Sequence, residues 1–350
     1  MYRSLAFLVL SSAALAQNAE TWKFAVSGDS RNCGDIVMPA IAAGVMQDNA
    51  KFYWHLGDYR AIYTIDEDLV PPRKLNLPSR TLSTSEYHAA AWPDFISHQL
   101  AAFGSLPVFL AIGNHETISP MNRTHYLAEF ARWLNARPLR KQRQADNPRD
   151  HEPRTWYHWV DHNIDFITLD NASTDEFDAE QVAWFKSLIS RDEASPQIRA
   201  IVVGMHAALP GSFGFNHSMN DWIQGELSGN QVYLALWHAQ ESAHKHVYVL
   251  ASHSHFFMED VYRTTYWKEK VLPGWIVGTA GAVRYRLPAG AAASGRKAMT
   301  NVYGYLLGTA ASDGSISFAF HQLTVDDLLR ANQGKAPAPL VHWCFDENHQ

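Results

Sequence analysis

Short runs of β-branched and aromatic residues recur along this chain with helical patterns between them, and this arrangement limits the possible fold more than any other feature. Strands are expected over residues 22–27, 52–56, 108–112, 156–160, 164–169, 198–203, 246–251, 274–277, 303–308 and 316–320. Helices are expected, where apolar residues recur at every third or fourth position, over residues 35–48, 86–103, 123–135, 178–190 and 221–239. Strands interspersed with helices are typical of the α/β class, to which we assign the chain.

The fourth expected helix has the clearest pattern. Asp178 precedes its first turn and can cap it, and one apolar stripe is formed by Val182, Phe185, Leu188 and Ile189. This stripe predicts a helix that packs on a sheet. Residues 137–154 combine six basic residues with three prolines, and this composition predicts a loop instead.

The size and charge of the chain limit its class further. With 350 residues, of which 47% are hydrophobic, it can bury a substantial core. Its net charge of −6 offers no cationic surface of the kind that dominates nonspecific nucleic-acid binding, so no nucleic-acid partner is expected. The oligomeric state cannot be read from the sequence.

The N-terminal residues predict export. Tyr2 and Arg3 precede an apolar run from Leu5 to Ala16, which is too short to cross a bilayer and ends in small residues. This pattern predicts a signal peptide over residues 1–16 and a mature protein that is secreted or periplasmic and makes no contact with the membrane. An uncleaved membrane anchor is the alternative.

Two cysteines, Cys33 and Cys344, are far apart in the sequence. In the oxidising environment of an exported protein they could pair. Sequence spacing says nothing about the geometry that a bridge requires, so a disulfide and two free thiols both remain open.

Polar side chains directly follow five of the expected strands. They are Asp29, Asp58, the run Asn114–His115–Glu116, His206, and the pair His253 and His255. Because ligands in open α/β sheets bind beyond the carboxyl ends of the strands, these groups can converge in space. Taken singly, an Asp or Asn here is more often a turn or helix cap, and a histidine more often a hydrogen-bonded core residue. The agreement of five segments favours a shared site.

In order, these segments read GDSR, GDY, GNHE, GMH and SHSH. Over about residues 22–256 this ordered set resembles the metallophosphoesterase superfamily, which includes the calcineurin-like and purple-acid-phosphatase-like enzymes. The resemblance implies a four-layer αββα sandwich of two mixed sheets flanked by helices. It also implies that residues 17–350 form a single metallophosphoesterase domain with a C-terminal extension.

The resemblance further implies a dinuclear metal-dependent hydrolase that cleaves a phosphate mono- or diester by attack of a metal-bound hydroxide. Asp58 would bridge two divalent or trivalent ions. Asp29 and His255 would also bind the first ion, and the second ion would be bound by Asn114, His206 and His253. Iron, manganese and zinc all suit these ligands. His115 would protonate the leaving oxygen. Glu116 would orient a histidine.

The chain departs from the family pattern at two positions. Arg31 stands where many relatives have a histidine ligand, and a guanidinium does not ligate metal. We expect Arg31 to contact the substrate phosphate, with a structural salt bridge as the alternative. Ala61 stands where purple acid phosphatases have a tyrosine, so an iron tyrosinate is not predicted. His217 can line the substrate pocket or be an ordinary loop histidine.

Other functions are compatible with the same residues. One alternative is a catalytically silent exported protein that binds phosphate or carbohydrate on the same scaffold. Another is cleavage of a bond other than a phosphate ester by the same centre. The presence of six expected ligands and of His115 favours an enzyme with a small phosphorylated substrate. The loops that shape the pocket leave the substrate itself undetermined.

Overall fold

The computed structural model describes residues 21–350 apart from 79–80, 174–175, 215–216, 292–294 and 296. The predicted signal peptide over residues 1–16 lies outside the described residues. Among the residues that are described, no helix is both long and apolar enough to cross a membrane.

Two mixed sheets form the centre of the structure. The five-stranded sheet has the order β12–β11–β1–β2–β3 and contains β1 (Trp22–Ser27), β2 (Tyr53–His55), β3 (Val108–Leu110), β11 (Gly304–Ala310) and β12 (Ile316–Gln322). The seven-stranded sheet has the order β10–β8–β9–β7–β6–β5–β4 and contains β4 (Tyr157–Asp161), β5 (Ile164–Thr168), β6 (Ala200–Gly204), β7 (His246–Ala251), β8 (Phe257–Glu259), β9 (Gly274–Val277) and β10 (Ala298–Met299). Strands β1, β2 and β3 are parallel, as are β5, β6, β7 and β9.

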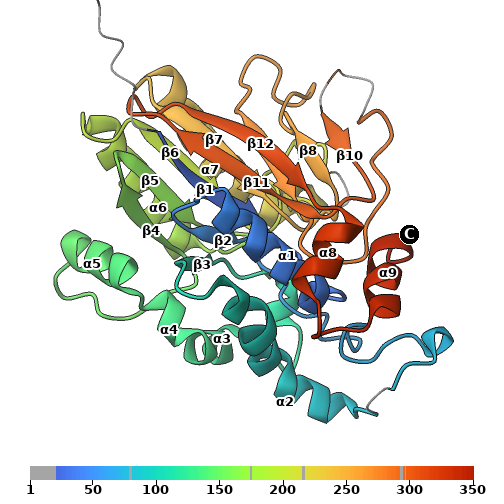
Figure 1. The fold of residues 1–350 in the computed structure, drawn as a ribbon. Coiled ribbons are helices and arrows are strands. Elements are labelled where there is room, and N and C mark those ends of the chain that lie inside the picture. Colours follow the sequence, from blue (N-terminus) through green and yellow to red (C-terminus); the bar gives the residue numbers. More distant parts are fainter. Residues whose placement is uncertain (1–20, 79–80, 174–175, 215–216, 292–294, 296) are drawn as a thin grey trace, which may run out of the picture.

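Helices cover the outer faces of both sheets (Figure 1). Helices α1 (Gly34–Gln47) and α8 (Val325–Ala331) lie side by side on the five-stranded sheet, and α6 (Ala179–Ala194) and α7 (Ile223–Glu241) cover the seven-stranded sheet. Helices α2 (Thr84–Asp94), α3 (Arg123–Glu129) and α4 (Ala131–Leu134) lie beyond β3, and α9 (Ala338–Asp346) packs against α8. The predicted four-layer αββα sandwich is confirmed.

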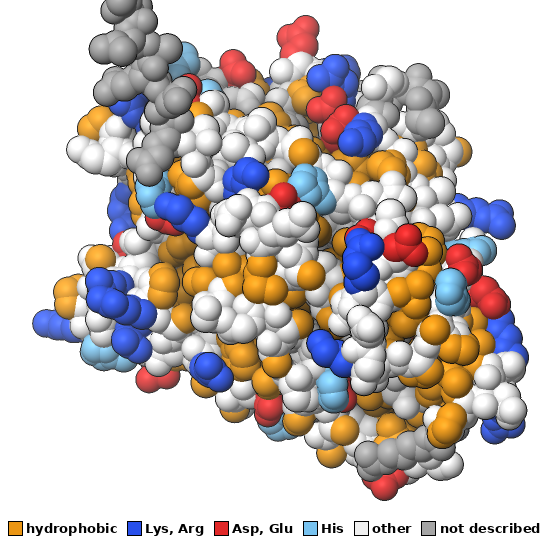
Figure 2. Space-filling model, viewed as in Figure 1, with side chains coloured by type: hydrophobic (Ala, Val, Ile, Leu, Met, Phe, Trp, Pro, Cys, Tyr) orange, Lys and Arg blue, Asp and Glu red, His pale blue; other side chains and the backbone are white. Residues whose placement is uncertain are grey.

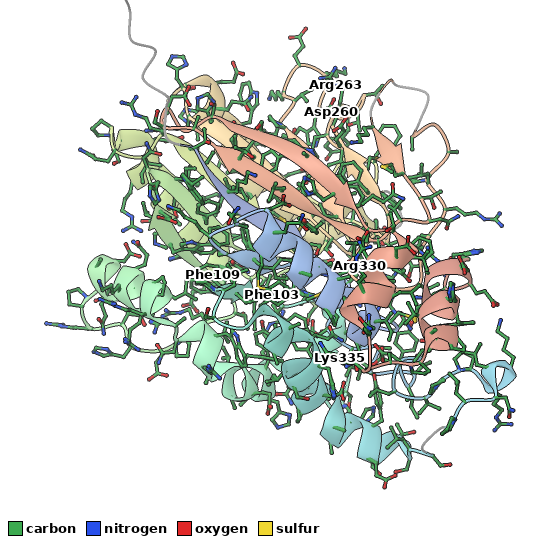
Figure 3. All side chains as sticks on the ribbon, in the orientation of Figure 1. Phe103, Phe109, Asp260, Arg263, Arg330 and Lys335 are labelled. Carbon is green, nitrogen blue, oxygen red and sulfur yellow. A yellow bond between two sulfur atoms is a disulfide. The ribbon has the colours of Figure 1, made fainter. Side chains whose placement is uncertain are left out.

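Aromatic side chains fill the space between the two sheets. Phe24 of β1 meets Phe166 of β5 edge to face, with ring centroids 5.1 Å apart. Phe109 of β3, labelled in Figure 3, stacks on Trp159 of β4 at a centroid distance of 3.9 Å. Such pairs bury large apolar areas and add specific ring contacts, so they fix how the two sheets lie on each other.

The predicted cap and stripe of α6 are confirmed. The carboxylate of Asp178 accepts a hydrogen bond from the backbone N–H of Gln181 at 2.7 Å. The side chains of the stripe are all buried against the seven-stranded sheet: Val182, Phe185, Leu188 and Ile189.

Residues 137–146 correct a prediction, because they form helix α5 (Arg137–Asp146) where a loop was expected. Pro138 stands in the first turn, where its missing N–H costs no helical hydrogen bond. Leu139 is buried, and the helix packs beside β4. Lys and Arg side chains gather along this edge of the molecule (Figure 2).

Several other elements differ from the expected pattern. The short strands β8 and β10 and the helices α8 and α9 were not predicted. The helix expected over 86–103 continues from α2 into a π-helical turn (Phe95–Gln99) and a 3₁₀ turn (Leu100–Phe103). The helix expected over 123–135 is divided into α3 and α4 at Phe130.

The two cysteines are joined. A disulfide links Cys33, at the start of α1, to Cys344 in α9, with their Cα atoms 5.9 Å apart. It ties the C-terminal helix to the segment that immediately follows β1.

Candidate metal centre

The predicted site residues follow the carboxyl ends of five strands. Asp29 comes after β1, Asp58 after β2, and Asn114 and His115 after β3. His206 follows β6, and His253 and His255 follow β7. Because β1, β2 and β3 are parallel in one sheet and β6 and β7 in the other, these loops meet at one end of the sandwich.

The turns after β1, β2 and β7 have left-handed backbone. Asp29, Asp58 and His253 have φ values of 60°, 59° and 63°. Residues other than glycine seldom adopt this conformation, and such residues collect at functional sites. The backbone N–H of Asp29 donates to the carbonyl of Gly57 at 2.9 Å, so the first two turns hold each other.

A close approach of two loops explains the glycines after β2 and β3. Gly57 has a φ of +93°, and a Cβ there would lie 2.5 Å from the backbone nitrogen of Gly113. A Cβ at Gly113 would lie 2.3 Å from Oδ1 of Asp58. Larger residues at either position would therefore push the loop of Asp58 away from that of Asn114.

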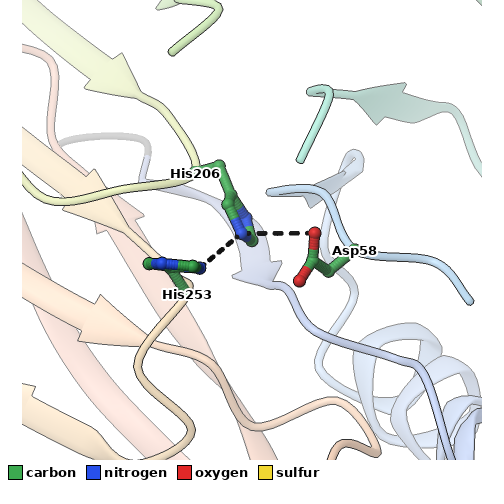
Figure 4. A group of neighbouring side chains, drawn as sticks. All are labelled: Asp58, His206 and His253. Atoms are coloured by element: carbon green, nitrogen blue, oxygen red, sulfur yellow. Dashed lines mark hydrogen bonds and ion pairs between the residues drawn. The ribbon is translucent and has the colours of Figure 1, made fainter. Parts of the chain in front are cut away.

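One group of candidate ligand atoms is centred on His206 (Figure 4). Nε2 of His206 lies 3.3 Å from Oδ1 of Asp58 and 2.9 Å from Nδ1 of His253. It also lies 2.9 Å from Oδ1 of Asn114. A carboxylate, an amide oxygen and two imidazoles thus converge from four loops. Such a mixed set suits iron, manganese or zinc.

A second group shares Asp58 with the first. Ligand atoms of Asp29, Asp58 and His255 all lie within 4.8 Å of one another. Oδ1 of Asp29 is 3.3 Å from Nε2 of His255. Oδ1 of Asp29 and Oδ2 of Asp58 are buried and have no hydrogen-bond partner among the described residues. Buried, unpaired carboxylate oxygens are costly unless a cation faces them, so the donor set fits a metal centre.

Backbone carbonyls orient the imidazoles. Nδ1 of His206 faces the carbonyl of Leu56 at 2.9 Å, and Nδ1 of His255 faces that of Val283 at 2.7 Å. A carbonyl can only accept, so both Nδ1 atoms carry the proton and both Nε2 atoms point into the site. Metal-binding histidines commonly donate their other N–H in this way.

The charge states also suit cation binding. Burial alone would raise the pKa of Asp29, but the imidazoles of His255 and His206 outweigh it and lower the pKa to about 2. Burial lowers the pKa of His253 well below its usual range, which leaves this ring neutral. Burial would lower the pKa of His206 too, but Asp58 raises it to about 10. A cation would therefore displace a proton from His206, because only a neutral imidazole is a ligand.

His115 lies beside the shared carboxylate. Its Nδ1 is 2.5 Å from the carbonyl of Ala61, and its Nε2 is 3.5 Å from Oδ2 of Asp58. Its backbone N–H donates to Oδ1 of Asp58 at 3.0 Å. The ring is therefore fixed, with Nε2 directed toward the two groups of ligand atoms.

Glu116 departs from the expectation that it orients a histidine. Its carboxylate accepts backbone hydrogen bonds from Asp58 at 2.8 Å, Tyr59 at 2.9 Å and Gly113 at 2.8 Å. It joins the loop after β2 to the loop after β3, and no sequence pattern indicated this role. Burial and the charge of Asp58 raise the pKa of Glu116 to about 8.

Arg31 lies inside the site. Its Nε is 3.8 Å from Oδ2 of Asp58, and its Nη2 is 3.2 Å from Nε2 of His255. Two tyrosines that the sequence did not single out as site residues also contact it. Nη1 donates to the hydroxyl of Tyr63 at 2.8 Å and Nη2 to that of Tyr285 at 3.4 Å.

His217 lies at the entrance to the site. Its ring centroid is 5.0 Å from that of His253 and 5.1 Å from that of Tyr285. With Tyr285 and Arg286 it lines a cavity of about 700 Å³. Contact of His217 with a substrate stays a prediction.

Neither a protein-family model nor a curated protein sequence matches this chain. Solved structures match at the level of the fold. PhoD is similar with a TM-score of 0.55 and 13% identity, over 88% of this chain and 72% of that one. Purple acid phosphatase PPD1 from yellow lupin has a TM-score of 0.51 and 14% identity, over 89% of this chain and 55% of that one.

A third similar structure is GAP50, described as the anchor in the inner membrane complex of Plasmodium. Its TM-score is 0.50 at 12% identity, over 94% of this chain and 96% of that one. Together these likenesses confirm that the chain has the metallophosphoesterase fold that its motifs predict. Because one fold can host several functions, the chemistry has to be argued from the site.

Proposed function

We propose that this protein is an exported, metal-dependent phosphoric ester hydrolase that acts on a small phosphate mono- or diester. The observation that carries the proposal is the convergence of Asp29, Asp58, Asn114, His206, His253 and His255 from five strand ends. Oδ1 of Asp29 and Oδ2 of Asp58 are buried and accept no hydrogen bond from the described residues, which favours positive charge beside them.

The ligand assignment follows from the two groups. Asn114, His206 and His253 would hold an ion together with Asp58, and Asp29 and His255 offer a further set of donors beside the same carboxylate. Iron, manganese and zinc all suit the site. When bound, a metal would supply positive charge to the phosphate oxygens and lower the pKa of water.

Residues of the chain would complete the reaction. The bond from Nδ1 of His115 to the carbonyl of Ala61 fixes the ring, so that Nε2 can give a proton to the leaving oxygen. His217, at the cavity wall, would contact the substrate. Arg31 would face the phosphate with a charge that does not titrate.

Export is part of the proposal. The apolar segment before Gln17 reads as a signal peptide. The disulfide between Cys33 and Cys344 supports an oxidising compartment, where such bonds persist. The protein would therefore act in the periplasm or outside the cell.

A second candidate is a catalytically silent exported protein that binds phosphate or carbohydrate. Two observations favour it: Arg31 contacts candidate ligands of a metal, and GAP50, of which 96% is covered, is described as an anchor. The retention of His115 beside Asp58 favours the enzyme.

The test compares purified variants after reconstitution with manganese, zinc or iron, on an aryl phosphate monoester and diester. We expect Asp58→Asn to abolish turnover and His115→Ala to lower kcat about a hundredfold or more, because a positioned acid contributes at least that much. His151→Ala, at an exposed loop position, is the matched control. Metal binding without turnover in the wild-type protein, on these substrates and on nucleotides, would favour the silent binding protein.

A further inference from the structure

The side chain of Arg31 is built into one of the two groups of ligand atoms. Only 5% of the residue is exposed. Nδ1 of His255 faces the carbonyl of Val283 and carries the proton, so its Nε2 has a lone pair. That lone pair accepts a hydrogen bond from Nη2 of Arg31 at 3.2 Å. The electron pair that would bind a metal is therefore already used.

The guanidinium is held in this place from several sides. The hydroxyls of Tyr63 and Tyr285 accept hydrogen bonds from it, and its Cζ lies 5.8 Å from the centroid of the Tyr63 ring. Tyr285 in turn stacks on His255 at a centroid distance of 4.0 Å. Arg31 is thus a fixed part of the site.

The backbone around Arg31 is fixed as well. The N–H of Ser30 donates to the carbonyl of Asp58 at 2.9 Å. Two residues after Arg31, Cys33 forms the disulfide with Cys344. A shift of the loop that would withdraw Arg31 from the site is opposed by both links.

The positive charge of Arg31 disfavours a metal ion in one of the two groups of ligand atoms. Arg31 is always protonated, and its Nε lies 3.8 Å from Oδ2 of Asp58. A divalent ion held by Asp29, Asp58 and His255 would face this positive charge across a few ångströms in a buried site, where repulsion is strong. The other group has four candidate ligand atoms. Nε2 of His206 contacts the remaining three, which belong to Asp58, Asn114 and His253.

The same chain places an arginine among acids elsewhere. Asp35, Asp94 and His98 also have the geometry of a metal group. The buried guanidinium of Arg60 forms ion pairs with both of these carboxylates. There the guanidinium of Arg60 supplies positive charge to both carboxylates.

We infer that Arg31 takes the place of a metal ion beside Asp29, Asp58 and His255, and that the protein holds one ion, at Asp58, Asn114, His206 and His253. Arg31 then supplies the second positive charge for the substrate phosphate. This inference rests on the proposed function and replaces the dinuclear centre that the motif resemblance implies with a mononuclear one.

The test is the metal content of the full-length mature protein. After saturation with manganese or zinc and removal of free metal, elemental analysis should give one ion per chain in the wild-type protein. Arg31→His, which restores an imidazole, should bind two. His206→Ala should bind no ion, and Arg31→Ala should bind more than one ion per chain. Circular dichroism checks that each variant is folded.

A spectroscopic measurement is independent of activity. Wild-type protein loaded with manganese should give the electron paramagnetic resonance spectrum of an isolated ion, and Arg31→His that of a coupled pair. Two ions per wild-type chain, with a coupled spectrum, would overturn the inference and leave a metal-dependent hydrolase standing if turnover is present. A wild-type chain that binds no metal and shows no turnover would sink both proposals.

Discussion

At the residue scale, Asp58 belongs to both groups of candidate ligand atoms. Its Oδ1 lies near His206, and its Oδ2 lies near His115 and Arg31. Glu116 holds the turn in which Asp58 stands, because its carboxylate accepts the backbone N–H groups of Asp58 and Gly113. The position of the Asp58 carboxylate therefore depends on the buried side chain of Glu116.

The variant Glu116→Gln tests this positioning role. The amide replaces one accepting oxygen by an NH₂ group, which would face backbone donors and push the two loops apart. We expect the Kd for manganese, measured by calorimetry, to rise about tenfold or more, as for other residues that orient metal ligands from outside. Glu152→Gln, at an exposed position, is the control. Equal Kd values for the two variants would show that Glu116 does not position Asp58.

The sequence indicated the candidate ligands more completely than the residues around them. Asp29, Asp58 and His206 could be found because each directly follows a strand, and chain order carries that information. Tyr63 and Tyr285 could not, because they reach Arg31 from loops whose path depends on the whole fold. The motif indicated that Arg31 lies in the site, but not its hydrogen bonds with His255, Tyr63 and Tyr285.

At the element scale, ten strands could be predicted, and β8, β10, α5, α8 and α9 could not. All ten expected strands are present to within about two residues at their ends, as is usual for boundaries read from a pattern. Strand β10 has two residues and is too short to show a period, and β8, although as long as β2 and β3, was not recognised. Helix α5 was missed because its prolines and charges were weighed above its single buried residue, Leu139.

The cap of α6 gives a prediction at this scale. Asp178→Ala removes the acceptor for the N–H of Gln181 and should lower the free energy of unfolding by about 1 kcal/mol. Asp178→Asn keeps a capping oxygen and should remain close to wild type. Denaturant unfolding compares the two variants. Equal losses in both would mean that the charge of Asp178, and not its capping bond, stabilises the helix.

At the scale of the whole molecule, one buried ion group joins α5 to the seven-stranded sheet. Nε2 of His158 in β4 is 2.6 Å from Oδ2 of Asp146, and its Nδ1 is 2.8 Å from Oδ1 of Asp165 in β5. Burial would lower the pKa of His158, but the two carboxylates raise it to about 9. Asp192, whose pKa is raised to about 8, and Arg191 lie next to this group.

This raised pKa predicts how stability depends on pH. The stabilisation by protonated His158 is complete below its unfolded pKa of about 6.5 and is lost as pH rises through about 9, a change of about 3 kcal/mol. The variant His158→Gln should therefore lower the free energy of unfolding more near pH 6 than near pH 9.5. Denaturant unfolding of both proteins at the two pH values measures this. A cost that does not change with pH would show that the pKa of His158 is the same in the folded and the unfolded protein.

The central claim is that the strand-end residues form a metal centre that cleaves phosphate esters. The most direct measurement is turnover of an aryl phosphate by the wild-type protein after complete chelation and then during titration with manganese, zinc or iron. We predict no hydrolysis by the chelated protein and a rate that rises with metal until the site is filled. Undiminished hydrolysis after chelation, or no binding of any of the three metals, would contradict the account.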